Sequence, residues 1–244
     1  MLLNEVGLQL YSLKDECARD FAATLENVAR MGYSAVEFAG YGGLTGQALK
    51  KLLEDNQLQA WGAHVGLDRL NTALDQEVEI NLAVGSRCLV CPYAEMKTRD
   101  DALRLADALN EVNRKIAPLG MKLGYHNHAH EFATDGGKYL LDILFERLDA
   151  SVFAELDVFW VAYAGVDPVA YIQKYAGRQQ MIHLKELAAN GRDNPEIGSG
   201  MLDFTAIINA AREAGVNRFI VEQEEYTCPP LQSCKKSLDA LKRL

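Results

Sequence analysis

The sequence predicts an α/β protein, a (β/α)8 TIM barrel that forms a single domain over residues 1–244. Short apolar runs alternate with longer stretches whose apolar residues recur at helical spacing, and this alternation repeats eight times. The short runs are almost continuously apolar, which is typical of parallel strands covered by helices. The length of 244 residues is also close to the ~250 residues of such a barrel. No linker or low-complexity segment interrupts the series, so one domain is expected.

The first half of the chain contains four strand–helix units. Apolar residues at helical spacing identify the first helix, and Gly32 follows it in the manner of a C-terminal cap. Thr45 is placed to cap the second helix. We expect strands at residues 6–11, 35–39, 59–65 and 87–91, and helices at 21–31, 45–53, 70–84 and 99–119.

The second half repeats the same pattern. Asp167 and Pro168 open a helix, because a proline at the first helical position lacks only an N–H group that would be unpaired anyway. Gly215 closes the next helix. We expect strands at residues 121–127, 151–156, 180–184 and 218–223, and helices at 138–148, 168–175, 204–214 and 231–244.

The composition argues against several classes of protein. The formal net charge of −9 disfavours a nucleic-acid partner, because binding to a phosphate backbone depends on clustered Lys and Arg. No long run lacks charge, so no membrane span is expected. Residues 1–7 lack the basic flank and apolar stretch of a signal peptide, and a cytoplasmic location is therefore expected. The composition is compatible with a homo-oligomer.

The cysteines and glycines indicate structural roles. Five scattered cysteines do not form a disulfide framework in a chain of this length, and reduced thiols are expected. Cys88 and Cys91 have the spacing of a metal or redox pair but lie in an apolar run without a second pair nearby, so we expect small buried residues. No glycine-rich dinucleotide or P-loop motif is present. The glycines at 198 and 200 are expected to serve the geometry of a loop.

Polar residues gather where the fifth to eighth predicted strands end, in segments 124–131, 154–157, 181–186 and 219–224. The carboxyl ends of barrel strands converge on one face, which carries the function of such barrels. Asp157, His183, Glu222 and a fourth residue from the first segment could therefore hold one divalent cation. Carboxylates and imidazole form a mixed oxygen and nitrogen set that suits Mn²⁺, Mg²⁺, Co²⁺ or Zn²⁺. Without a cation, the gathered carboxylates would repel one another.

Each of these residues also has an interpretation without a metal. Asp157 could cap a turn, His183 could be a hydrogen-bonded core histidine, and Glu222 could pair with a basic side chain. The histidines at 126, 128 and 130 could belong to a polar loop. All of these interpretations would have to hold together at the same end of four consecutive strands, and this coincidence favours the site. Alternation also places Glu155 on the same strand face as Asp157, and Glu224 on the same face as Glu222.

Four motifs resemble the sugar phosphate isomerase/epimerase family, the xylose-isomerase-like TIM barrels. They are GYHNHAHEF at residues 124–132, LDVFWVAYAGVDP at 156–168, HLKE at 183–186 and VEQEEY at 221–226. The resemblance covers essentially the whole chain. It is specific for the superfamily and says little about the substrate.

The resemblance implies one bound cation, Mn²⁺ first, with Mg²⁺, Co²⁺ or Zn²⁺ as alternatives. Asp157, His183 and Glu222 match the family's ligands on strands six, seven and eight. The ketose epimerases of this family carry a Glu on strand five, where this chain has His126. Either His126 is itself a ligand or Glu131 reaches back to the metal, and Glu131 is favoured because a third carboxylate preserves the charge of the site. The predicted metal ligands are thus Glu131, Asp157, His183 and Glu222.

The implied activity is that of an isomerase or epimerase of a small ketose or sugar phosphate. The metal would polarise the carbonyl and stabilise an enediolate, with Glu222 or His126 taking the α-proton. If His126 or His128 instead protonates a leaving hydroxyl, the same intermediate leads to a dehydratase or lyase of a keto-inositol or 3-keto sugar. A small-molecule sugar is the expected partner, and its expected contacts are Glu37, His64, Trp160, Lys185 and Glu224. A DNA-repair barrel and a non-catalytic sugar-binding barrel are the remaining alternatives.

Overall fold

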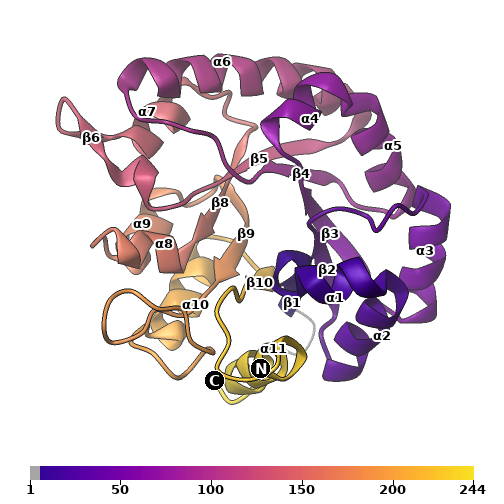
Figure 1. The fold of residues 1–244 in the computed structure, drawn as a ribbon. Coiled ribbons are helices and arrows are strands. Elements are labelled where there is room, and N and C mark those ends of the chain that lie inside the picture. The colour runs from indigo at the N-terminus through magenta and orange to yellow at the C-terminus, as the bar shows by residue number, and fades with distance from the viewer. Residues whose placement is uncertain (1–5) are drawn as a thin grey trace.

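Eight parallel strands close into a barrel in the computed structural model, which describes residues 6–244 (Figure 1). Around the barrel the order is β1, β2, β3, β4, β5, β8, β9 and β10, and β10 pairs with β1 to complete the ring. The fold class is therefore the one that the sequence predicts. The barrel strands are β1 Val6–Gln9, β2 Ala35–Phe38, β3 Gln59–His64, β4 Cys88–Cys91, β5 Lys122–His126, β8 Phe153–Asp157, β9 Gln179–Leu184 and β10 Phe219–Val221.

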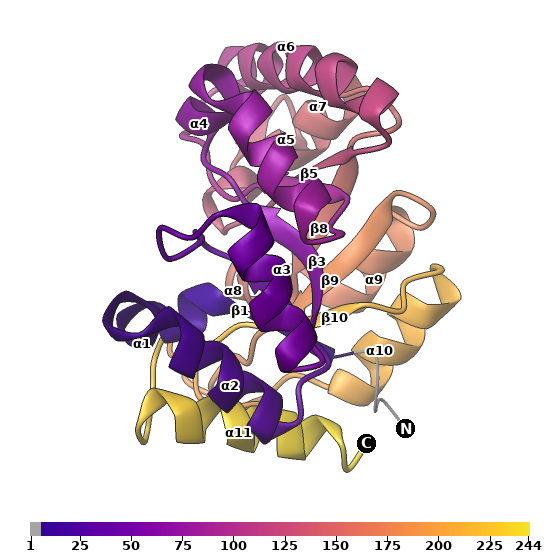
Figure 2. The same cartoon turned by 90° about the vertical axis from the view of Figure 1, so that its right-hand side faces the viewer.

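Helices surround the barrel on the outside (Figures 1 and 2). The first and last helical layers meet, since the Tyr33 hydroxyl, next to β2, donates to the carbonyl of Cys234 in α11 at 2.8 Å. This contact joins the two ends of the chain on one side of the barrel. The helices are α1 Lys14–Arg19, α2 Phe21–Met31, α3 Gly46–Asp55, α4 Leu67–Thr72, α5 Leu74–Ala83, α6 Arg99–Ile116, α7 Leu140–Arg147, α8 Val158–Tyr163, α9 Pro168–Lys174, α10 Phe204–Glu213 and α11 Pro230–Leu241.

Several helix ends follow the capping residues that the sequence indicates. Gly32 takes a left-handed conformation with φ of 95° and ends α2. The Thr45 side chain accepts a hydrogen bond from the backbone N–H of Ala48 at 3.3 Å. Asp167 caps α9 by accepting from the N–H of Val169, with Pro168 at the first helical position. These local signals set the entry and exit points of the helices.

The structure also contains short elements that the sequence does not predict. The first strand ends at Gln9, because the 3-10 helix η1 Leu10–Leu13 and α1 follow it directly. The helix expected at 70–84 is two helices, α4 and α5, that meet at Ala73. Further 3-10 turns and a two-stranded hairpin lie outside the barrel sheet: η2 Ala117–Leu119, η3 His130–Phe132, β6 Thr134–Asp135 and β7 Lys138–Tyr139.

The barrel interior is divided into an apolar layer and a polar layer. One buried apolar cluster fills the interior toward the amino ends of the strands, with Ala35, Trp61, Cys88, Val90, Phe153, Met181 and Ile220. Side chains alternate along a strand, so Glu155 and Asp157 follow Phe153 on the same face of β8, and His183 follows Met181 on β9. The polar residues therefore sit on an apolar floor, toward the carboxyl ends of the strands.

No helix within residues 6–244 is long and apolar enough to cross a membrane. Cys88 and Cys91 are buried free thiols in β4. Residues 1–5, to which part of the expectation about a signal peptide refers, lie outside the described residues.

Candidate metal centre

Four neighbouring barrel strands bring together a set that we call the strand-end cluster: His126, Asp157, His183 and Glu222. The strands β5, β8, β9 and β10 are adjacent in the barrel wall, and each contributes the residue at or near its carboxyl end. His126 Nε2 lies 3.5 Å from Asp157 Oδ2 and 3.9 Å from Glu222 Oε2. His183 Nδ1 lies 3.0 Å from Glu222 Oε2. One ligand atom from each residue lies within 4.8 Å of all the others.

Asp157 is placed for both roles that the sequence leaves open, helix cap and metal ligand. Its Oδ1 accepts from the backbone N–H of Phe159 at 2.8 Å and so caps α8. Its Oδ2 is buried and has no hydrogen-bond partner within residues 6–244. The same is true of His126 Nε2, 3.5 Å away. Buried polar atoms are normally paired, so these two atoms and their donor chemistry fit a cation between them.

Glu131 lies outside this cluster. Its carboxylate accepts from the Tyr125 hydroxyl at 2.8 Å and from the backbone N–H of His128 at 2.9 Å. The turn η3 folds Glu131 back against β5, and the side chain is fully buried there. The structure thus brings His126, the alternative ligand, together with Asp157, His183 and Glu222.

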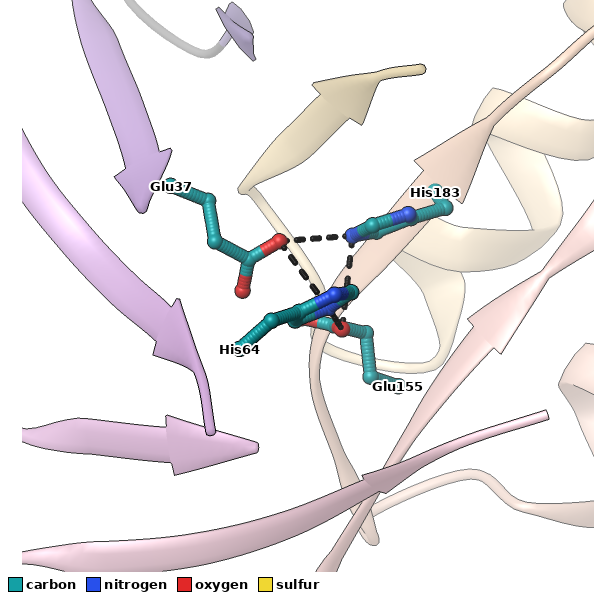
Figure 3. A group of neighbouring side chains, drawn as sticks. All are labelled: Glu37, His64, Glu155 and His183. Carbon is teal, nitrogen blue, oxygen red and sulfur yellow. Dashed lines mark hydrogen bonds and ion pairs between the residues drawn. The ribbon is translucent and has the colours of Figure 1, made fainter. Parts of the chain in front are cut away.

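A second group, which we call the cross-barrel cluster, contains Glu37, His64, Glu155 and His183 (Figure 3). Its residues come from opposite sides of the barrel, with β2 and β3 on one side and β8 and β9 on the other. His183 Nε2 lies 2.8 Å from Glu37 Oε2, and His64 Nε2 lies 2.8 Å from Glu155 Oε2. Glu37 and His64, which were expected to contact the substrate, therefore lie beside the imidazole of His183.

Glu155 is the residue that the sequence reasoning did not choose for the site. Alternation along β8 indicated a face shared with Asp157, and both side chains are indeed buried in the barrel interior. Each belongs to a different cluster, because Glu155 lies two residues before Asp157 on β8 and therefore deeper in the barrel.

The buried charges shift the pKa values of both clusters. Burial favours the neutral imidazole of His183, but Glu155 and Glu222 outweigh it and raise its pKa well above 6.5. Burial and the nearby imidazoles of His183 and His64 hold the pKa of His126 well below 6.5. Burial raises the pKa of Asp157, and the positive charge of Lys185 partly offsets this increase. The shift at His126 favours the unprotonated imidazole, which is the form that binds a metal, whereas His183 must give up a proton to bind one.

The clusters open into a cavity of about 320 Å³ at the mouth of the barrel. Its lining includes His64, His126, His128 and Glu222, with the exposed rings of Tyr11 and Tyr93 at the rim. A cavity of this size suits a small ligand. A larger cavity of about 710 Å³ lies outside the barrel, between the β6–β7 hairpin and α7, and contains none of the predicted site residues.

His128 is the imidazole of this cavity that belongs to neither cluster. Its ring lies 5.2 Å from the Trp160 ring and 5.4 Å from the Tyr93 ring, measured between centroids. Its Nδ1 is buried and has no hydrogen-bond partner in the described part of the chain. Burial, with a contribution from His126, lowers its pKa to about 3. His130, in contrast, faces the loop after β4 and lies 3.0 Å from the carbonyl of Ala94.

Lys185 and Trp160 line a neighbouring cavity of about 410 Å³, which shares Glu224 with the mouth cavity. The Lys185 ammonium pairs with Glu224 and lies 4.8 Å from the centroid of the Trp160 ring. Lys185 is almost completely buried, and Trp160 Nε1 is buried without a partner among residues 6–244. Glu186 does not pair with Lys185 but accepts from the backbone N–H of Gly198 at 3.0 Å. The glycine loop at 198–200 is thus held in place by a hydrogen bond to the Glu186 side chain.

Comparisons with known proteins agree with this architecture. The chain is similar to an inosose dehydratase from Clostridium beijerinckii, with 34% identity over 159 residues that cover 57% of this chain and 53% of that protein. A second inosose dehydratase, from Geobacillus kaustophilus, is 28% identical, with 57% and 52% covered. The matched region thus spans about half the length of these relatives.

The fold is similar over its whole length to a solved structure. A sugar phosphate isomerase/epimerase from Parabacteroides distasonis superposes with a TM-score of 0.86 and 28% identity, covering 99% of this chain and 98% of that one. The sequence model of the xylose isomerase-like TIM barrel matches residues 25–244. The closed barrel, its polar mouth and this match together show that the chain belongs to the xylose isomerase-like TIM barrel family.

Proposed function

We propose that this protein is a divalent-cation-dependent dehydratase that removes water from a small keto-polyol or keto-sugar. The observation that carries the proposal is His128, whose imidazole lines the cavity and belongs to neither cluster. Glu222 and Glu224 line the same cavity, and Lys and Arg are missing from its lining as far as residues 6–244 are concerned. A substrate without a phosphate group fits this lining better than a sugar phosphate.

The residues that would hold the cation are His126, Asp157, His183 and Glu222. Two of their atoms, His126 Nε2 and Asp157 Oδ2, are buried and free for a further contact within the described chain. When bound, the cation would act as a Lewis acid toward a carbonyl oxygen of the substrate, with Mn²⁺, Mg²⁺, Co²⁺ or Zn²⁺ all compatible with the donor set.

His128 would move the proton in this reaction. As a neutral imidazole, it takes the proton from the carbon next to the substrate carbonyl. The electron pair of that C–H bond forms the carbon–carbon double bond as the neighbouring C–O bond breaks. His128 then returns its proton to the departing hydroxyl, which leaves as water. One residue thus serves as base and then as acid, and the products are an enone and water.

Lys185 and Trp160 would position the substrate. The buried Lys185 ammonium places a positive charge beside the mouth, and its pairing with Glu224 fixes its direction. Trp160 lies against both His128 and Lys185 and offers a ring face to an apolar face of the substrate. The inosose dehydratases among the relatives support this reaction class, although they are matched over only half their length.

A second candidate is an isomerase or epimerase of a small ketose. It is favoured by the 28% identity to a sugar phosphate isomerase/epimerase over almost the entire chain. In this reaction Glu222 would take the α-proton and a proton would return to the carbon skeleton, so that no hydroxyl would leave.

The two reactions differ in what they release. We expect the protein, loaded with Mn²⁺ and incubated with a panel of keto-inositols and 3-keto sugars, to generate ultraviolet absorption from an enone together with a product lighter by one water. The same incubation in D₂O separates the candidates, because isomerisation introduces deuterium at the α-carbon without loss of water. Deuterium incorporation without any enone across the panel would overturn the dehydratase in favour of the second candidate.

A further inference from the structure

The cross-barrel cluster has the dimensions of a metal coordination shell. Four atoms form a closed ring: Glu37 Oε2, His183 Nε2, Glu155 Oε2 and His64 Nε2 (Figure 3). Successive distances around this ring are 2.8, 3.3, 2.8 and 3.4 Å. A four-coordinate zinc ion holds nitrogen and oxygen ligands at about 2.0–2.1 Å, which places the corners of the tetrahedron roughly 3.3 Å apart. The four sides of the ring are thus close to four of the six edges of such a tetrahedron, and all four atoms lie within 4.8 Å of one another.

The imidazole protons alone do not satisfy this ring. Each imidazole Nε2 carries at most one proton, yet each faces two carboxylate oxygens. The two imidazoles can thus donate two hydrogen bonds, whereas the ring contains four close contacts between nitrogen and oxygen. The second oxygens of both carboxylates, Glu37 Oε1 and Glu155 Oε1, are buried without a hydrogen-bond partner in the described chain. A cation at the centre would contact all four ring atoms at once.

The surroundings of the ring also suit a cation. Both carboxylates are completely buried, so their mutual repulsion is poorly screened. Gln9 Nε2 donates to Glu37 Oε2 at 2.8 Å and fixes this carboxylate from outside the ring. The His64 side chain is 10% exposed and lines both the mouth cavity and a neighbouring cavity of about 580 Å³, which gives an ion a route to the ring.

We propose that Glu37, His64, Glu155 and His183 form a second cation site, suited to a four-coordinate ion such as Zn²⁺. It is distinct from the strand-end cluster and is joined to it by the two nitrogens of His183. With Nε2 on the ion, Nδ1 keeps a proton that it donates to Glu222, 3.0 Å away. The proposal does not depend on the reaction that the strand-end cluster performs.

The test uses a variant that weakens the strand-end cluster and leaves the fold intact. Asp157→Asn removes one anionic ligand there but keeps the Oδ1 that caps α8. After treatment with a chelator and reloading with Zn²⁺, we expect this variant to retain about one equivalent by elemental analysis. Adding Glu155→Gln should abolish retention. Adding Glu131→Gln, a matched change at a buried carboxylate outside both clusters, should not.

Cobalt gives a second readout that does not depend on activity or on the Glu155 variant folding. Co²⁺ in the Asp157→Asn variant should show the strong visible absorption of a four-coordinate ion, and His64→Asn in that background should remove it. If the Asp157→Asn protein retains no Zn²⁺, or if retention and the Co²⁺ spectrum survive the loss of Glu155 or His64, the second site does not exist.

Discussion

At the scale of single residues, His128 separates proton transfer from cation binding. It lines the cavity, while the other two histidines in that lining belong to the clusters. We predict that His128→Asn lowers kcat of the elimination by about 10²–10⁴-fold, as for loss of a general acid–base group. Its bound metal should be unchanged by elemental analysis.

His130→Asn is the matched control for this experiment. His130 lies two residues further along, is close to the Ala94 carbonyl and does not itself line the cavity. Its substitution should leave kcat within a few-fold of the wild type. Equal rates for wild type and His128→Asn would remove His128 from the mechanism.

Individual residues also show where prediction from the sequence succeeds and fails. Asp157, His183 and Glu222 could be brought together from the sequence, because the ends of consecutive parallel strands converge. The choice between His126 and Glu131 could not be made in this way. It depends on the path of residues 127–133, which the hydrogen bond from Tyr125 to Glu131 helps to fix, and that bond forms only in the folded chain.

At the scale of elements, the loop between β9 and α10 depends on a glycine. A Cβ at Gly200 would collide with the carbonyl oxygen of Leu187, which already accepts from the Met201 N–H at 2.8 Å and cannot withdraw. Gly200→Ala should therefore lower the free energy of unfolding by about 1–3 kcal/mol. In thermal unfolding, each kcal/mol corresponds to about 2–4 °C in Tm for a chain of this size.

Gly66→Ala provides the comparison for Gly200→Ala. Gly66 has φ of −57°, and a Cβ there would meet no atom within 4 Å of the described chain. A loss of no more than about 1 kcal/mol is expected. A larger loss at Gly66 than at Gly200 would contradict the steric argument.

The same loop is anchored to the C-terminal segment by Glu196. This carboxylate accepts from the Thr227 hydroxyl at 2.6 Å and from the Ser233 hydroxyl at 3.0 Å. Burial opposes ionisation, but these hydrogen bonds outweigh it and lower the pKa of Glu196 from 4.5 to about 2. The carboxylate thus stabilises the folded state above pH 4.5, and this contribution is lost as the pH falls toward 2.

Glu196→Gln should consequently cost about 1.5–3 kcal/mol at pH 7 in urea unfolding. The difference from wild type should shrink between pH 4.5 and pH 2. Glu111→Gln, at an exposed position on α6, should show no such trend. A difference that stays constant with pH would refute the assignment.

The helices and strands themselves differ in how far the sequence predicts them. The long amphipathic helices and the apolar strands follow from periodicity alone. The short helices α1 and α8, of six residues each, do not. A helix of this length is not stable by itself, and α8 exists because Asp157 caps it at the end of β8. The cap can be expected from the sequence, but six residues give too short a periodic pattern to predict the helix itself.

At the scale of the whole molecule, cation binding should stabilise the barrel. The two clusters draw on β2, β3, β5, β8, β9 and β10, so an ion would tie distant parts of the ring together. A cation at 100 times its Kd contributes about 2.7 kcal/mol, because it binds the folded state alone. We predict that Zn²⁺ or Mn²⁺ raises Tm of the chelator-treated protein by about 5–11 °C.

His183→Asn should abolish this shift in Tm, because His183 serves both clusters. His130→Asn, outside both, should preserve it. A metal-treated wild type that melts at the same temperature as the chelated protein would argue against cation binding at either cluster.

The overall architecture was the most predictable property of the chain. Eight repeats of one pattern at this length leave few alternatives to a closed barrel, and the strand order follows from the connection rules. The strand register was not predictable. It decides which side chains of neighbouring strands lie at the same depth, such as Asp157 and His183 at the mouth, while Glu155 lies deeper and joins a second cluster.

The position of the His183 ring proton links cation binding at the two clusters. A ligand that takes Nδ1 leaves the proton to Nε2, and a ligand that takes Nε2 leaves it to Nδ1. Occupancy of either cluster thus changes the affinity of the other, and by the same factor in both directions. An ion at the centre of the barrel would in this way adjust the affinity of the mouth while remaining out of contact with the substrate.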